Sequence, residues 1–139
     1  MYPSCHNFII MIGILLITHG TLGEALIQCA CHVMNKRPEQ LLHLGLAAGD
    51  DPTDLLPLAQ QLVRIVDSGE GVLLLTDIYG ASPSNLAAKL LATGRIEGLA
   101  GVNLPMLLRA VNNRDKGMTT LLTRATGGGR DGVLNMLKH

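Results

Sequence analysis

The sequence is poor in aromatic residues and carries no excess charge of either sign. Its 139 residues include no tryptophan, two tyrosines and one phenylalanine, and 11 basic residues balance 11 acidic ones. Nucleic-acid modules that stack bases need aromatic side chains, and binding of a polyanion needs a basic surface. Both absences argue against a nucleic-acid partner. The core must therefore be built from aliphatic residues and methionine.

The sequence also lacks a long apolar run and an early positive charge. The run from Phe8 to Ile17 is shorter than the roughly 20 residues that a membrane-spanning helix needs. No lysine or arginine precedes Lys36, so the charged start of a secretory signal is missing. These features predict a cytoplasmic protein. Residues 1–10 are expected to form a poorly ordered extension, and residues 11–139 a single domain.

The three cysteines follow no metal-binding or disulfide pattern. Cys5 lies in the extension, and Cys29 and Cys31 fall on different faces of an expected helix. Thiols that stay reduced in the cytoplasm explain this set without a metal ion. The sequence therefore predicts neither a metal nor a cofactor.

The stretch from Ile12 to Glu24 has the pattern around which the chain is organised. Ile12 to Ile17 is a continuously apolar run, typical of a strand buried on both faces. Thr21 and Glu24 have capping-box spacing, and apolar residues then recur with helical periodicity. His19 is thus expected in the turn between the carboxyl end of a strand and the start of a helix.

The same alternation continues along the chain and predicts an α/β fold. A three-layer open sheet is expected, with four parallel strands, helices on both faces and a C-terminal edge strand exchanged in a dimer. Strands are predicted at residues 12–17, 41–46, 71–76 and 99–102. Helices are predicted at residues 22–35, 82–93, 104–111 and 119–125. A further helix is predicted to start between residues 51 and 54 and to end at residue 66. Pro57 favours the later start of the second helix, and Ser82 a helix cap. Gly127 to Gly129 are expected to break the chain before a short last segment, Val133 to Leu137, that is a strand or a helix.

Two polar residues end strands that can be neighbours in this sheet. His19 follows the first strand and Asp77 the third, and all parallel strands end at one edge, where α/β proteins bind ligands. A carboxylate on one imidazole nitrogen would leave the other free as a nucleophile. The start of the next helix would bring together the Ser82 side chain and the N–H groups of Gly80, Ala81 and Ser82. The N-terminus of a helix attracts anions.

Each of these residues also has a plain structural explanation. His19 can be a capping or core-edge histidine, Asp77 a solvated loop acid, and Ser82 a simple helix cap. Their shared edge of the sheet, rather than any one of them, points to phosphoryl transfer through histidine.

Three ordered motifs resemble the enzyme IIA domain of mannose-family phosphotransferase systems. They are Met11 to Gly20 (MIGILLITHG), Leu75 to Asn85 (LTDIYGASPSN) and Ala100 to Leu107 (AGVNLPML). The C-terminal residues Thr126-Gly127 and Arg130 to Val133 are similar to that family's last turn. The resemblance extends from about Met11 to the C-terminus, and Ala81 stands where many members have glycine.

The resemblance implies a mechanism and partners. A phosphohistidine on the small histidine phosphocarrier protein would donate its phosphoryl group to His19, at Nε2. Asp77 would hold Nδ1, and Ser82 with the helix start would bind the phosphoryl oxygens. A IIB component would accept the group, and peripheral association with a membrane permease is compatible with this role. The family also implies a homodimer in which a C-terminal strand joins the partner's sheet.

Two other functions remain open at this point. The chain can be a regulatory phosphoprotein, in which the state of His19 signals to a partner without sugar transport. A hydrolase using His19 and Asp77 is disfavoured, because no Gly-x-Ser-x-Gly elbow and no metal cluster accompany them.

Overall fold

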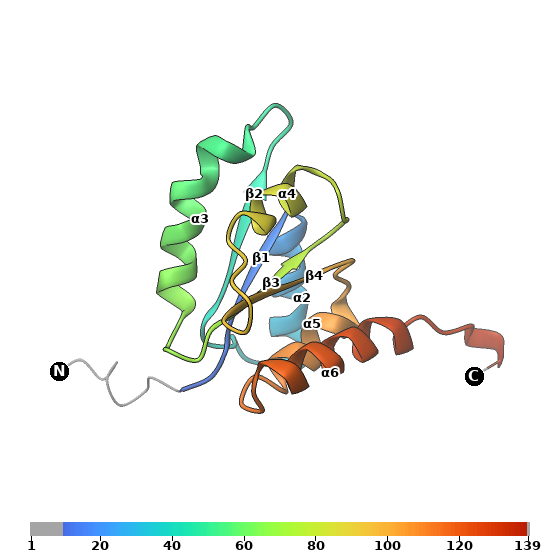
Figure 1. Cartoon of the computed structure of the whole chain (residues 1–139). Coiled ribbons are helices and arrows are strands. Elements are labelled where there is room, and N and C mark those ends of the chain that lie inside the picture. The colour runs from blue at the N-terminus through green and yellow to red at the C-terminus, as the bar shows by residue number, and fades with distance from the viewer. Residues whose placement is uncertain (1–9, 139) are drawn as a thin grey trace.

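A computed structural model describes residues 10–138 as an open sheet covered by helices (Figure 1). The elements in chain order are β1 (Gly13–His19), α2 (Leu22–Met34), β2 (Leu41–Leu46), α3 (Pro52–Val66), β3 (Val72–Thr76), α4 (Ser82–Ala88), β4 (Ile96–Ala100), α5 (Leu104–Val111), α6 (Met118–Asp131) and the 3₁₀ turn η1 (Met136–Lys138). The predicted extension, residues 1–10, lies outside the described residues except for Ile10. Between residues 10 and 138, no helix is long and apolar enough to cross a membrane.

All four strands are parallel, in the order β2-β1-β3-β4, so the predicted open sheet of four parallel strands is confirmed. β1 and β3 are neighbours, and Ile17 lies opposite Thr76 in their register. His19 and Asp77 each follow this pair at its carboxyl end. The sheet therefore brings together the two strand ends on which the predicted site depends.

Alternate residues of β1 face two separate halves of the core. Ile14 and Leu16 belong to a buried cluster with α2, α5 and α6, whereas Leu15 and Ile17 belong to a cluster with α3 and α4. All four side chains are completely buried. Since a strand buried on both faces cannot show polar alternation, the continuous apolar run of β1 follows from this three-layer arrangement.

α3 starts within the predicted range of 51 to 54, but not at the later start that Pro57 favoured, and α4 is shorter than predicted. α3 begins at Pro52 and holds Pro57 inside it, because Asp51 caps the helix by accepting from the Thr53 N–H at 2.9 Å. This cap and a proline in the first turn, which suits that position, outweigh the hydrogen bond that Pro57 cannot donate. α4 ends at Ala88 rather than near Gly94, and β4 starts earlier than predicted, at Ile96.

The predicted chain break at Gly127 to Gly129 is wrong. These glycines lie inside α6, which continues to Asp131 and packs along α5. A Cβ on Gly128 would lie 2.6 Å from the Arg109 Cβ, and one on Gly129 would lie 2.9 Å from the Met106 Cε. Close approach of the two helices, rather than flexibility, therefore explains Gly128 and Gly129.

The glycine triplet offers a matched pair of substitutions. Gly128→Ala should lower the free energy of unfolding by about 1–3 kcal/mol, because the added methyl group clashes with Arg109 and the helices must separate. Gly127→Ala should raise it by about 0.5–1 kcal/mol, because alanine favours helix and its Cβ meets no atom within 4 Å. Urea unfolding measures both values. Equal stabilisation by both substitutions would contradict the packing role of Gly128.

Candidate functional site

The turn that ends β1 is held against β2 by two glycines. Gly20 has φ of +51° and donates its N–H to the Leu46 carbonyl oxygen at 2.8 Å. A Cβ on Gly45 would lie only 2.0 Å from the Gly20 carbonyl oxygen. The absence of a side chain at Gly45 thus lets the chain turn tightly after His19 and fixes where the imidazole begins.

Thr18 anchors the helix that follows, and the predicted capping box is wrong. Thr21 occupies the N-cap position of α2 but makes no capping hydrogen bond through its side chain. The hydroxyl of Thr18, which is fully buried, instead accepts from the Gly23 N–H at 2.8 Å. Sequence reasoning missed Thr18 because this contact starts from a strand residue outside the usual capping spacing.

Asp77 holds both the main chain and the ring of His19. One carboxylate oxygen, Oδ2, accepts from the His19 N–H at 3.0 Å and lies 2.8 Å from the ring atom Nδ1. The other, Oδ1, accepts from the Ile78 N–H at 3.1 Å. The side chain of Asp77 is 12% exposed and that of His19 is 53% exposed. A shielded carboxylate therefore orients a ring that solvent and other molecules can reach.

This geometry selects one form of the neutral imidazole. A carboxylate oxygen only accepts hydrogen bonds, so the neutral ring must carry its proton on Nδ1. The lone pair of Nε2 is then free to act as a nucleophile. The predicted meeting of His19 and Asp77 is present in the structure.

Hydrogen bonding keeps Asp77 ionised at this position. Burial alone would raise the pKa of Asp77, but hydrogen bonds from the His19 main chain and ring, with a main-chain bond at Asp77 itself, together hold that pKa below its usual value. The unfolded chain binds the proton more readily. The contribution of Asp77 to folding is thus present above about pH 4 and is lost as the pH falls through the folded-state pKa.

Ser82 lies at the same edge of the sheet, five residues after Asp77. It is exposed and is the first residue of α4, while Ala81 is the N-cap, so Ser82 does not cap the helix as predicted. The Gly80 N–H donates to the hydroxyl of Ser84 at 3.2 Å, a partner that the sequence did not reveal. Of the three predicted anion donors, Gly80 is therefore already engaged within the chain.

The site is open rather than enclosed. The hollow beside it, lined by Thr76, Tyr79 and Ser84 among others, has a volume of about 100 Å³, well below the roughly 300 Å³ of a small-molecule pocket. Leu22, Ile78 and Tyr79, on the two segments that follow β1 and β3, are 42%, 57% and 86% exposed. An exposed nucleophile beside exposed apolar side chains suits a reacting group carried by another protein. Among the described residues, no group of His, Cys, Asp and Glu is placed to hold a metal ion.

The chain matches proteins of one transport system in sequence. A family model described as "PTS system fructose IIA component" matches residues 13–125. The mannose-specific EIIAB component of Escherichia coli strain K12 is 30% identical over 125 residues, which is 88% of this chain. The chain spans 38% of the length of that relative. The fructose-specific EIIA component of Bacillus subtilis is 29% identical over 106 residues. This match covers 76% of this chain and 72% of the Bacillus subtilis protein.

The fold matches solved structures of the same system. The phosphotransferase system component EIIA from Streptococcus agalactiae superposes with a TM-score of 0.81. It is 23% identical, and the match covers 93% of this chain and 100% of that one. At this identity the likeness supports the fold, while the sequence match supports the family.

The contact between His19 and Asp77 predicts the tautomer of the ring. In the neutral ring, ¹⁵N NMR should find the proton on Nδ1 and an unprotonated Nε2. Asp77→Asn should keep the fold but weaken this preference, because an amide can turn either a donor or an acceptor toward Nδ1. Asp131→Asn, at an exposed residue at the end of α6, should leave the ring signals unchanged. A wild-type ring protonated mainly at Nε2 would refute the assignment.

Proposed function

Because this chain belongs to the family of mannose- and fructose-type IIA components of the phosphotransferase system, we propose that it is a phosphocarrier acting through His19. One observation carries the proposal: Asp77 Oδ2 lies 2.8 Å from Nδ1, so Nε2 is the free nitrogen of an exposed ring. Nε2 attacks the phosphorus of a phosphohistidine on the histidine phosphocarrier protein. The new N–P bond forms as the donor's N–P bond breaks, and the donor imidazole leaves.

The neighbouring residues have distinct roles in this proposal. Asp77 stabilises the positive charge that develops on the His19 ring during attack and prevents the ring from turning away. Ser82, through its exposed hydroxyl and its N–H, and Ala81, through its N–H, would bind the phosphoryl oxygens at the start of α4. The Gly80 N–H would join them only by exchanging its bond with Ser84.

Passage of the group onward requires an acceptor, for which we propose a IIB component. The mannose-specific relative is named as an EIIAB component, so its name joins a IIA and a IIB part in one protein. In this role the chain would act in the cytoplasm, at most peripherally associated with a permease. If instead phosphorylated His19 only signals to a partner, no IIB would take its phosphoryl group.

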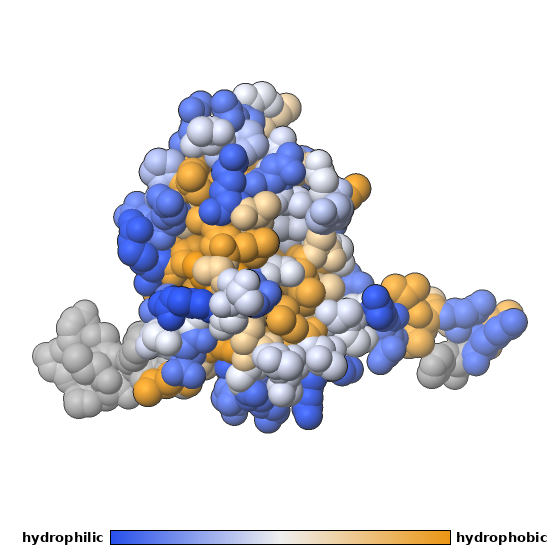
Figure 2. All heavy atoms as spheres, viewed as in Figure 1, coloured by the Kyte–Doolittle hydropathy of each residue, from blue (hydrophilic) through white to orange (hydrophobic). Residues whose placement is uncertain are grey.

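We also propose that the chain forms a homodimer through the edge of its sheet. β4 is an edge strand, and its Gly98 and Ala100 are exposed. Apolar residues gather on the face in front of β4 and α4 (Figure 2). Leu91, in the segment between these two elements, is 50% exposed. In the last segment, Met136 and Leu137 are 91% and 95% exposed and form one 3₁₀ turn. Pairing of this last segment with the partner's β4 would cover the exposed edge of that strand and the exposed apolar side chains of the segment.

Phosphorylation tests the role of His19. Incubation with phosphoenolpyruvate, enzyme I and the histidine phosphocarrier should give an adduct that is stable in base and labile in acid. His19→Ala should not be labelled, while His32→Ala and His43→Ala should be labelled normally. Asp77→Asn should be labelled more slowly, on the order of 10- to 100-fold, because its ring is less well oriented.

The same experiment separates the competing functions. Label that passes from His19 to a purified IIB supports the phosphocarrier, whereas label that stays on His19 supports the regulatory alternative. Persistent labelling of His19→Ala would remove the central claim.

Removal of the last segment tests the homodimer. Because Gly127 to Gly129 belong to α6, the truncation should end after Gly132 so that this helix stays intact. The full chain should scatter light as a dimer at low micromolar concentration, and the truncated chain as a monomer or an aggregate. A full chain that is monomeric and unchanged by truncation would exclude this assembly.

A further inference from the structure

A buried arginine lies at the edge of the sheet opposite to His19. Arg114 follows α5, is only 5% exposed, and accepts at its carbonyl oxygen from the Ile12 N–H at 3.1 Å. Its Nη1 donates to the carbonyl oxygens of Glu39 at 2.5 Å and Gln40 at 3.2 Å. Its Nε is buried and has no hydrogen-bond partner among the described residues. Arg114 therefore has a donor that the folded chain does not use.

Arg114 lines a pocket that carries more positive than negative charge. The pocket has a volume of about 340 Å³ and lies between the segment after α2 and the end of α5. Three cations, Lys36, Arg37 and Arg114, line it, against one acid, Glu39. None of the ion pairs formed within residues 10–138 includes Arg114. The charge of Arg114 is thus enclosed without a carboxylate in contact.

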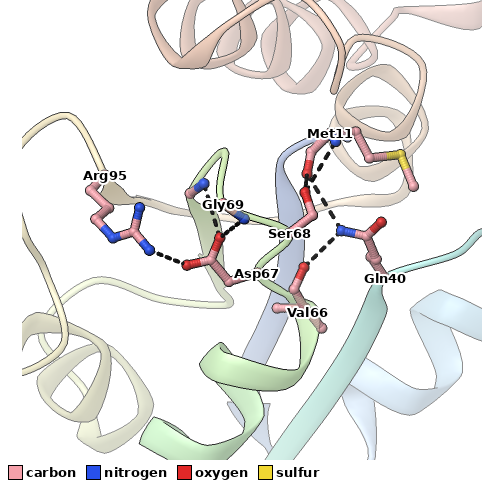
Figure 3. Close-up of polar contacts among 8 residues, drawn as sticks. Met11, Gln40, Val66, Asp67, Ser68, Gly69 and Arg95 are labelled. Carbon is pink, nitrogen blue, oxygen red and sulfur yellow. Dashed lines mark hydrogen bonds and ion pairs between the residues drawn. The ribbon is translucent and has the colours of Figure 1, made fainter. Parts of the chain in front are cut away.

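In a second basic pocket, a carboxylate of the chain pairs with one of the arginines, and we call it the compensated pocket. It is lined by Arg64, Lys89 and Arg95, together with Asp67. Asp67 pairs with Arg95 at 2.5 Å and also accepts from the N–H groups of Gly69 and Gly71 (Figure 3). The chain supplies its own carboxylate there, but supplies none in contact with Arg114.

A buried, unpaired charge is unfavourable because water no longer solvates it. Burial lowers the pKa of Arg114 to about 10, and the charge of Glu39 offsets only part of this shift. The guanidinium nevertheless stays protonated at neutral pH. An anion in contact with the guanidinium would supply the opposite charge that the chain does not place there.

We propose that the pocket lined by Lys36, Arg37 and Arg114 binds a small organic oxyanion through the guanidinium of Arg114, which has no carboxylate in contact with it among the described residues. Guanidinium groups match the geometry of carboxylates and phosphates, so both belong to the ligand class. The volume of the pocket is in the range of small-molecule sites and leaves room for carbon atoms beside Met11 and Met34.

The pocket is separate from the proposed phosphoryl site. Ile12, which contacts Arg114, immediately precedes β1, whereas His19 is the last residue of β1. A seven-residue strand extends about 20 Å, so the anion would not reach His19. Failure of anion binding would therefore leave the proposal for His19 unaffected, and the reverse also holds.

Titration followed by NMR tests the proposal on the full chain. Inorganic phosphate, glycerol 3-phosphate and citrate are added separately, with sodium chloride at matched ionic strength as the reference. The Nε–Hε signal of Arg114 should shift and saturate with at least one of the organic anions, and less with inorganic phosphate. The arms with glycerol 3-phosphate and citrate distinguish a phosphate from a carboxylate ligand.

Two exposed lysines provide a matched pair of variants. Lys36→Glu, in the proposed pocket, should weaken binding of the anion at least fivefold, while Lys89→Glu, in the compensated pocket, should leave it unchanged. Both substitutions change the net charge equally and replace exposed side chains, so folding should be kept. Shifts no larger than those with sodium chloride, or equal weakening by both variants, would overturn the proposal.

Discussion

The parallel pairing of β1 with β3 is the constraint on which the structure depends. It joins two strands that are far apart in the chain, and it places Ile17 opposite Thr76 at the edge where both strands end. Apart from His19, the residues of both strands are buried, so their N–H and C=O groups must find hydrogen-bond partners within the sheet. A shift in this register would separate Asp77 from His19 as well as disturb both halves of the core.

Much of the fold and the two central residues of the candidate site could be predicted because the signals are local. The apolar runs of β1, β2 and β3 and the helical periodicity between them depend only on neighbouring residues. A parallel sheet then follows, and with it the shared edge that holds His19 and Asp77. That β1 and β3 are neighbours was an assumption of the sequence analysis, and the structure confirms it.

The features that the sequence did not reveal depend on contacts between distant segments. Three glycines in a row favour a break in the chain, but here the surface of α5 makes small residues necessary in a helix. In the sequence Thr18 resembles any other strand residue, because its contact is with a residue of the following helix: its hydroxyl accepts from the Gly23 N–H. Asp51 decides where α3 begins, although Pro57 argued for a later start. In each case tertiary packing outweighs local preference.

The double contact of Asp77 with His19 also has a consequence for rate. Because one oxygen binds both the main-chain N–H and the ring, the imidazole is restrained at two points while half of its surface stays open to solvent. The conformational entropy of placing that ring is lost once, when the chain folds, rather than in every encounter with another molecule. In the proposed transfer, a reacting partner would therefore meet a group whose orientation is already set, and only the partner's own approach would remain to be ordered.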